Sequence, residues 1–258
     1  MMNGRLCWPG ERAWRLLTRD IPYHDLGTEL TGVLAWDDAQ AGPRPGILLV
    51  HGGAGLDDHA REQARRYAGL GYTVLAGDMY GAGVAGSRER VMAAVTALRD
   101  DPELLARRGQ AGLEALAGCP EAGGRLGAVG FCFGGMAVLT LARAGAGAAG
   151  QELAGVVSMH GSLAAKRPAR PGEITARVLA CHGAADPHVP MSDVTAFAAE
   201  MEAAGADWQL NVYGGAQHGF THRHAVPGAM PGVAYHQATD MRSFAAAREF
   251  LASALAAD

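Results

Sequence analysis

Short apolar runs alternate with segments of helical periodicity along most of the chain. The run at 46–50 is continuous and apolar, which is typical of a parallel strand buried on both faces. Residues 14–36 alternate loosely and predict an opening pair of strands. Further strands are predicted at 72–76, 126–131, 156–159, 178–181 and 208–213, and helices at 57–70, 87–117 with an interruption near Pro102, 136–144, 194–204 and 244–255.

This alternation predicts an α/β fold: a doubly wound, mostly parallel sheet with helices on both faces. The alternation continues across residues 144–150, so we interpret that stretch as a loop within one domain that spans residues 1–258. The longest irregular segment is 219–236, with Pro227 and Pro231. Loops of that length inside a compact domain are often functional.

Composition and charge restrict the class of protein. With 49% hydrophobic and 19% charged residues, the chain has the balance of a soluble globular protein. A net charge of −4 gives no general attraction to nucleic acid or anionic membranes. No run approaches the ~18 apolar residues that span a bilayer, and the first residues lack the pattern of a signal peptide.

The four cysteines, Cys7, Cys119, Cys132 and Cys181, occur singly. In a chain of 258 residues this pattern favours free thiols over a disulfide framework, so we expect a cytoplasmic protein. We expect neither nucleic-acid nor membrane partners, and a homodimer is the default assembly for a soluble enzyme.

The most specific chemical motif is GFCFGG at 130–135, directly after a predicted strand and before a predicted helix. A sharp strand-to-helix turn of this kind is a nucleophile elbow, which would lift the side chain of Cys132 clear of the sheet. Flanking glycines are needed because neighbouring backbone crowds the turn. The following helix would direct its positive end at the sulfur and favour the thiolate. The alternative is a buried structural cysteine in a glycine-rich turn.

A cysteine nucleophile needs a base, and the base needs an orienting group. In elbow-containing folds an acid and then a histidine follow the nucleophile, each after a later strand. Asp186 follows the strand at 178–181 and a glycine turn, and His218 comes just after the strand at 208–213. Asp186 would hold the His218 imidazole in the correct tautomer. Alone, Asp186 could cap a turn and His218 could lie in a surface loop.

The turn at 51–54, HGGA, follows an inner strand and offers backbone N–H groups close to the elbow. We expect the N–H groups of Gly53 and Phe133 to form an oxyanion hole. Because this hole uses the main chain, the geometry of the turn matters more than its side chains.

Five segments together resemble the dienelactone hydrolase family of α/β-hydrolases. They are GFCFGG, GDMYG at 77–81, CHGAADPHVP at 181–190, YGGAQHGF at 213–220, and the stretch 232–235 before the last helix. The resemblance runs from about residue 45 to the end. It implies the α/β-hydrolase fold and a Cys132–His218–Asp186 triad that cleaves a small-molecule ester or lactone through an acyl-thioester, without cofactor or metal.

The departures from that family concern the substrate. Its members carry a glutamate in the turn after the inner strand, where this chain has His51 and glycines, and they bind a substrate carboxylate with arginines where this chain has Ala82 and His222. We therefore predict a neutral ester or lactone, with promiscuity toward other activated esters such as phosphotriesters. The expected substrate contacts are His51, Tyr80, His160 and His222, and for His160 a structural hydrogen bond is an equal alternative.

Two other motifs in the sequence suggest different sites, and two other functions are compatible with the fold. GAGVAG at 81–86 matches a dinucleotide fingerprint, but a predicted helix follows where that fingerprint needs a strand ending in an acidic residue. His218, His222 and His224 lack a carboxylate or cysteine at ligand spacing. An acyltransferase or thioesterase could use the same triad, and a non-catalytic redox-sensing or binding protein could retain the fold.

Overall fold

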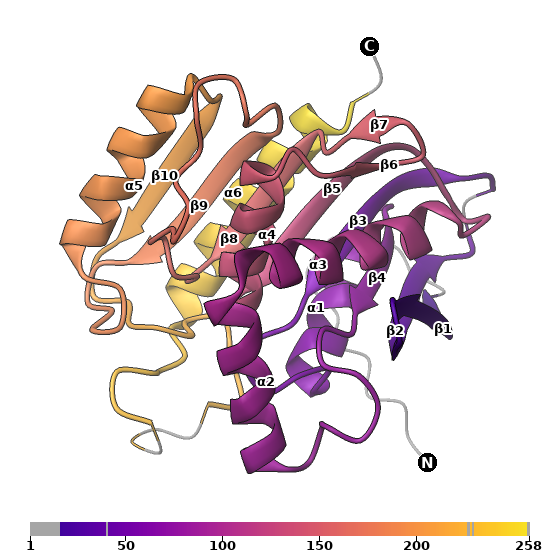
Figure 1. Cartoon of the computed structure of the whole chain (residues 1–258), viewed down its shortest axis with the longest axis horizontal. Helices are drawn as coiled ribbons and strands as arrows, with labels where there is room; N and C mark the ends of the chain where they lie inside the picture. The colour runs from indigo at the N-terminus through magenta and orange to yellow at the C-terminus, as the bar shows by residue number, and fades with distance from the viewer. Residues whose placement is uncertain (1–15, 40, 226–227, 229, 257–258) are drawn as a thin grey trace.

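The computed structural model describes residues 16–39, 41–225, 228 and 230–256 (Figure 1). Within them an eight-stranded sheet has the order β1-β2-β4-β3-β5-β8-β9-β10. In this sheet β4, β3, β5, β8, β9 and β10 run parallel to one another, and β2 is antiparallel to both of its neighbours. The strands are β1 Leu16–Asp25, β2 Thr28–Asp37, β3 Arg44–Val50, β4 Thr73–Gly77, β5 Ala122–Phe131, β8 Gly155–Met159, β9 Arg177–Gly183 and β10 Trp208–Tyr213.

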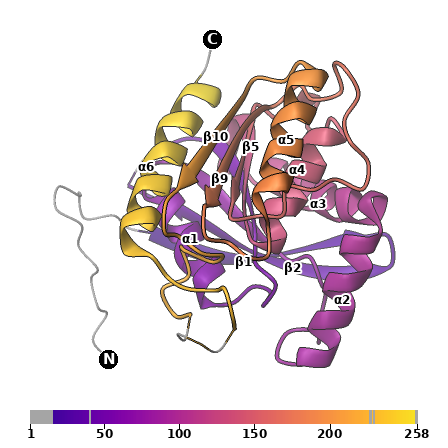
Figure 2. The same cartoon turned by 90° about the vertical axis from the view of Figure 1, so that its left-hand side faces the viewer.

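Helices cover both faces of this sheet (Figure 2). Helices α1 and α6 pack against one face, and α3, α4 and α5 pack against the other, each over its own apolar core. The helices are α1 Asp58–Ala68, α2 Arg88–Asp100, α3 Pro102–Ala117, α4 Phe133–Arg143, α5 Met191–Ala204 and α6 Gln237–Ala254. The predicted doubly wound α/β fold is therefore confirmed. None of the helices in the described part of the chain is long and apolar enough to cross a membrane.

Strand β3 illustrates why the continuous apolar run predicts a central strand. Leu48 and Val50 belong to the core beneath α3 and α4, whereas Ile47 and Leu49 belong to the core beneath α1 and α6. All four side chains are at most 1% exposed. A strand that is buried on both faces cannot alternate between apolar and polar residues.

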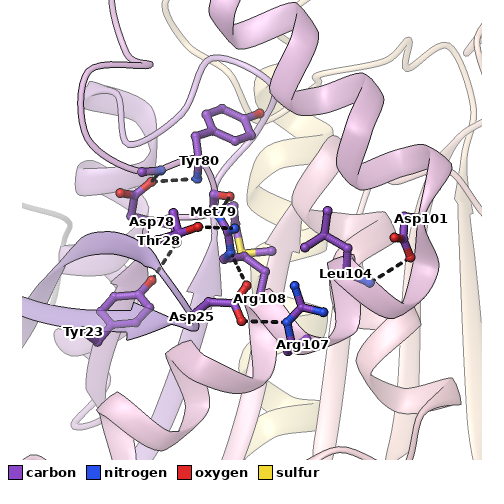
Figure 3. Close-up of polar contacts among 11 residues, drawn as sticks. Tyr23, Asp25, Thr28, Asp78, Met79, Tyr80, Asp101, Leu104, Arg107 and Arg108 are labelled. Carbon is purple, nitrogen blue, oxygen red and sulfur yellow. Dashed lines mark hydrogen bonds and ion pairs between the residues drawn. The ribbon is translucent and has the colours of Figure 1, made fainter.

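The interruption predicted near Pro102 is the boundary between α2 and α3. Asp101 caps α3, with its carboxylate accepting the N–H groups of Glu103 and Leu104 (Figure 3). Pro102 occupies the first turn of α3, where its missing N–H costs no hydrogen bond.

Residues 144–150 differ from the predicted loop, because they include half of a small hairpin. Strand β6 (Gly147–Ala148) pairs with β7 (Gln151–Glu152). Ala149 and Gly150, at the tip, have φ values of 54° and 76°, as a type I′ turn requires. Alanine is not a signal for that turn, so the sequence did not reveal it. Helices α4 and α6 also begin earlier than predicted, because the first turn of each lies ahead of its clear apolar periodicity.

Two buried ion pairs join distant parts of the fold. Asp25 on β1 accepts hydrogen bonds of 2.8 Å from Nε of both Arg107 and Arg108 on α3 (Figure 3). Arg66 on α1 donates to Asp240 on α6 at 2.6 Å, and the Asp240 side chain has no exposed surface.

The strand order determines where a site can form. The chain leaves β3 on one side to form β4 and later returns on the other side to form β5. The carboxyl ends of β3 and β5 therefore lie next to each other at a topological switch point, which is the usual ligand site of such sheets. The turn after β3 begins at His51, and the turn after β5 holds Cys132.

Candidate active site

Cys132 is the single residue between β5 and α4, and its backbone is strained. It has φ 54° and ψ −114°, a conformation that L-residues rarely adopt. Its N–H donates to the Met159 carbonyl at 3.0 Å, so the adjacent strand β8 holds the turn in place. The thiol is partly exposed, while Cys119 and Cys181 are buried. The backbone at Cys132 has the sharp strand-to-helix bend that the GFCFGG motif predicts.

The glycines around this turn are required by close backbone contacts. A Cβ atom on Gly130 would lie 1.9 Å from the carbonyl oxygen of Gly134, and one on Gly134 would lie 2.1 Å from the carbonyl oxygen of Val50. A real Cβ cannot occupy either place without moving the main chain. The bend therefore presses directly against the end of β3, which brings the sulfur to the turn at residues 51–55.

His218 and Asp186 come together with Cys132 at this edge. Nδ1 of His218 lies 2.8 Å from Oδ2 of Asp186, and the other side of the ring forms a hydrogen bond with the Cys132 sulfur. The second carboxylate oxygen of Asp186 accepts the N–H groups of His188 at 2.8 Å and Val189 at 3.3 Å. Because an ionised carboxylate only accepts hydrogen bonds, Nδ1 of His218 carries the proton that points at Asp186.

The electrostatics of this group favour a thiolate–imidazolium pair. Burial alone would raise the pKa of Cys132, but hydrogen bonds from His218 and from the N–H groups of Gly53 and Phe133 bring it below the usual value. Burial likewise opposes protonation of His218, yet the bonds to Asp186 and Cys132 raise its pKa to about 10. By contrast, burial raises the pKa of Cys181 to about 12, which keeps that thiol protonated.

The turn after β3 places Gly53 beside the Cys132 sulfur, and the start of α4 places Phe133 there. Hydrogen bonding from both backbone N–H groups lowers the pKa of the Cys132 thiol. A Cβ on Gly53 would meet nothing within 4 Å, so the turn is open on the side of its α-carbon. Backbone N–H groups beside a nucleophile are the kind of donor that an oxyanion hole uses.

Of the four residues expected to contact the substrate, three are buried in the structure. His51 is 0% exposed and His160 is 2% exposed, so neither presents surface to a ligand. Tyr80 is nearly buried, and its hydroxyl donates to the Gly53 carbonyl at 3.0 Å. His222 is the exception, since its side chain is 34% exposed. This burial has a simple cause: a residue at a strand end can point into the fold as readily as out of it.

His160 lies directly behind the nucleophile. Its backbone has φ 41°, and its Nδ1 accepts the Cys132 N–H at 3.2 Å. Its Nε2 lies 2.9 Å from Oγ1 of Thr221, which in turn lies 3.1 Å from Nε2 of His59. Burial lowers the pKa of both His160 and His59. The structural alternative considered for His160 therefore matches its position, and no sequence pattern pointed to Thr221 or His59.

His222 faces Asp57 across the mouth of the site. The two side chains are 3.6 Å apart, and Asp57 raises the pKa of His222. The His222 ring also stacks on His59, with centroids 4.6 Å apart. The sequence pattern does not identify Asp57 as a residue of the site. Its position before α1 marks it as a helix cap, and its Oδ1 accepts the Ala60 N–H at 3.0 Å. A proton on His222 would therefore be compensated by Asp57 within the protein.

The sheet order, the strained cysteine at the β5–α4 turn and the histidine and acid on later loops define an α/β-hydrolase. Residues 30–255 match the model of the dienelactone hydrolase family, and the chain belongs to that family. It is therefore a hydrolase that acts on esters.

Two solved structures are similar over nearly the whole chain. The structure called m3DLH is 38% identical, with a TM-score of 0.86, and the match covers 93% of this chain and 99% of that one. The dienelactone hydrolase-like promiscuous phosphotriesterase P91 from metagenomic libraries is 34% identical, with a TM-score of 0.84 and the same coverage. An uncharacterized Caenorhabditis elegans protein, K02A2.1, is 36% identical over 134 residues, which are 51% of this chain and 82% of its own.

Proposed function

We propose that this protein hydrolyses neutral carboxylic esters or lactones with Cys132 as nucleophile, His218 as general base and acid, and Asp186 as the group that orients His218. One observation carries the proposal. The Cys132 sulfur, on a strained turn, accepts hydrogen bonds from the His218 ring and from the N–H groups of Gly53 and Phe133.

In the acylation step the Cys132 thiolate attacks the carbonyl carbon, and the carbonyl π electrons move to oxygen. The N–H groups of Gly53 and Phe133 stabilise that oxyanion. When the tetrahedral intermediate collapses, the C–O bond to the alkoxide breaks and His218 delivers a proton to the leaving oxygen. The products are an alcohol, or an opened ring when the substrate is a lactone, and a thioester on Cys132.

In the deacylation step the neutral His218 ring takes a proton from a water molecule, and the water oxygen attacks the thioester. The C–S bond then breaks, the free acid leaves, and the thiolate–imidazolium pair returns. Asp186 stabilises the imidazolium in both steps, because its Oδ2 lies 2.8 Å from Nδ1.

A neutral substrate is supported by the two positions where family resemblance places carboxylate-binding arginines. Ala82 carries no charge, and His222 lies 3.6 Å from Asp57, which would balance its positive charge on protonation. A substrate carboxylate would therefore have to compete with Asp57 for His222. An uncharged ester group needs no such partner.

The test is hydrolysis of p-nitrophenyl acetate and of small neutral lactones by the wild-type protein, Cys132→Ala and Cys132→Ser. We expect Cys132→Ala to fall by at least about 10³-fold, since the nucleophile is lost, and Cys132→Ser to retain more activity, since its hydroxyl can replace the thiol as nucleophile. Cys119→Ala, which removes a buried thiol elsewhere, serves as the matched control and keeps activity. Substantial turnover by Cys132→Ala would overturn the assignment.

Phosphotriester hydrolysis is a second candidate, favoured by the similarity to the promiscuous phosphotriesterase P91. The same thiolate would attack phosphorus and expel an aryloxide, and water would then cleave the P–S bond. Release of p-nitrophenolate from a dialkyl p-nitrophenyl phosphate, measured beyond one equivalent of protein, tests it. A single-equivalent burst without turnover would show inactivation in place of catalysis.

A further inference from the structure

Tyr23 lies on the edge strand β1, far along the sheet from the elbow, yet its hydroxyl begins a chain of hydrogen bonds that ends at the nucleophile. The hydroxyl donates to the carbonyl of Asp78 at 2.7 Å (Figure 3). Tyr23 is 8% exposed, and burial raises the pKa of its phenol, so the hydroxyl keeps its proton.

The next step passes through a peptide plane. The Asp78 carbonyl and the Met79 N–H belong to the same trans peptide, so they point in opposite directions. Tyr23 holds the carbonyl end, and the Met79 N–H donates to Nε2 of His51 at 3.2 Å. A fixed carbonyl therefore aims the N–H at the buried imidazole.

His51 transmits this constraint to the turn after β3. Because its Nε2 accepts a proton from Met79, the neutral ring carries its own proton on Nδ1. Nδ1 lies 2.7 Å from the Gly52 carbonyl, to which it donates. Burial lowers the pKa of His51, which favours this neutral form. The Gly52 carbonyl shares its peptide with the Gly53 N–H, which points the opposite way. This turn lies against the nucleophile, since a Cβ on Gly52 would be 3.8 Å from Cβ of Cys132, and hydrogen bonding from the Gly53 N–H lowers the pKa of the thiol.

Two further contacts hold the same loop in place. Nη1 of Arg108 donates to the Met79 carbonyl at 2.9 Å, while the Tyr80 N–H, at the other end of that peptide, donates to Oδ1 of Asp78 at 2.9 Å. The Tyr80 hydroxyl then reaches the Gly53 carbonyl at 3.0 Å. The Asp78–Met79 and Met79–Tyr80 peptides are therefore held at both ends by hydrogen bonds. The carbonyl groups of Gly52 and Gly53, on either side of the Gly53 α-carbon, are held as well.

We propose that Tyr23 is a positioning residue of the oxyanion hole, acting through the Asp78–Met79 peptide and His51 to aim the Gly53 N–H at the reacting oxygen. This inference rests on the proposed hydrolysis at Cys132. In this series of hydrogen bonds, every donor points along the series toward the nucleophile, and aligned hydrogen bonds of this kind polarise one another. Tyr23 touches no substrate.

The experiment compares Tyr23→Phe with Tyr213→Phe. The first removes only the hydroxyl at the start of the chain. The second removes a hydroxyl on β10, at the opposite edge of the sheet, where it lies near Asn211 on the same strand and Cys181 on β9. The readouts are kcat and KM for p-nitrophenyl acetate, the pH profile of Cys132 alkylation by iodoacetamide, and the urea midpoint of unfolding.

For Tyr23→Phe we expect kcat to fall about 5- to 20-fold with KM within about twofold, a part of the 10²- to 10³-fold loss seen when an oxyanion donor is removed outright. The alkylation profile shifts to higher pH, because the Gly53 N–H also lowers the pKa of Cys132. Tyr213→Phe changes neither. Equal kcat and an unshifted alkylation profile in Tyr23→Phe would overturn the proposal.

His51 provides an independent variant pair. His51→Asn places an amide donor where Nδ1 stood and can still hold the Gly52 carbonyl, whereas His51→Ala cannot. We expect the kcat of His51→Asn to be at least about tenfold higher than that of His51→Ala. If Cys132 proves not to be the nucleophile, the alkylation profiles still test the chain of hydrogen bonds, so the two proposals can fail separately.

Discussion

Replacing Asp186 by asparagine should damage catalysis more than replacing it by alanine, although asparagine is the closer match in shape. Oδ1 of Asp186 accepts two backbone N–H groups, from His188 and Val189. An asparagine must therefore keep its oxygen at that place. Its NH₂ group then faces Nδ1 of His218, at a site where the wild type has an acceptor 2.8 Å away.

The magnitude follows from these bonds. A hydrogen bond to a charged group is worth about 1.5–3 kcal/mol, or about 10- to 150-fold in rate. Both variants lose that amount. In Asp186→Asn the amide also forces the His218 proton onto Nε2, the wrong tautomer, whose cost reaches about 10⁴-fold in a serine triad. In Asp186→Ala, water can enter and accept the Nδ1 proton.

Stability should follow the opposite order. Asp186→Asn still satisfies the N–H groups of His188 and Val189, whereas Asp186→Ala leaves both without their acceptor, at about 1–3 kcal/mol for each buried group. The assays are kcat/KM for p-nitrophenyl acetate and urea unfolding of both variants. We expect alanine to be the more active and the less stable of the two. An asparagine variant as active as the alanine variant would refute the assigned orientation of Asp186 and His218.

Three further predictions concern pH and packing. Because hydrogen bonding lowers the pKa of Cys132 and raises that of His218 to about 10, iodoacetamide alkylation should increase with pH in a range below the ordinary thiol pKa of about 8.5, and a single rise at or above about 8.5 would contradict the ion pair. Gly134→Ala should fail to fold, since its Cβ would lie 2.1 Å from a carbonyl oxygen, whereas Gly53→Ala should fold with activity within about threefold, checked by circular dichroism and ester hydrolysis. Asp240→Asn should lower the free energy of unfolding in urea by about 3–5 kcal/mol, because its partner on α1 stays buried; a change below 1 kcal/mol would contradict this.

The sequence predicts most of the sheet because its parallel strands are buried on both faces. Apolar runs such as β3 and β5 are stable only where both of their faces are buried, which is the centre of the sheet. Parallel strands connected by helices end at a common edge. The convergence of Cys132, His218 and Asp186 follows from that rule, since each comes after the carboxyl end of a strand. Their catalytic roles remain a proposal.

What could not be predicted depends on contacts between distant segments. The direction of His51 and His160 is decided by Met79, Gly52 and Thr221, none of which is marked by a local pattern. The link from Tyr23 to the site exists because β1 and β2 pair beside β4, and no periodicity specifies that neighbour.

The most direct test of the account is mass spectrometry of the protein mixed with p-nitrophenyl acetate and quenched in acid within the first turnover. Trypsin should release residues 126–143, which contain Cys132 as their one cysteine. The account predicts a single acetyl group on this peptide that hydroxylamine removes and that Cys132→Ala lacks. Steady product release with an unmodified peptide at every quench time, or an acetyl group carried at another residue with matching kinetics, would contradict it.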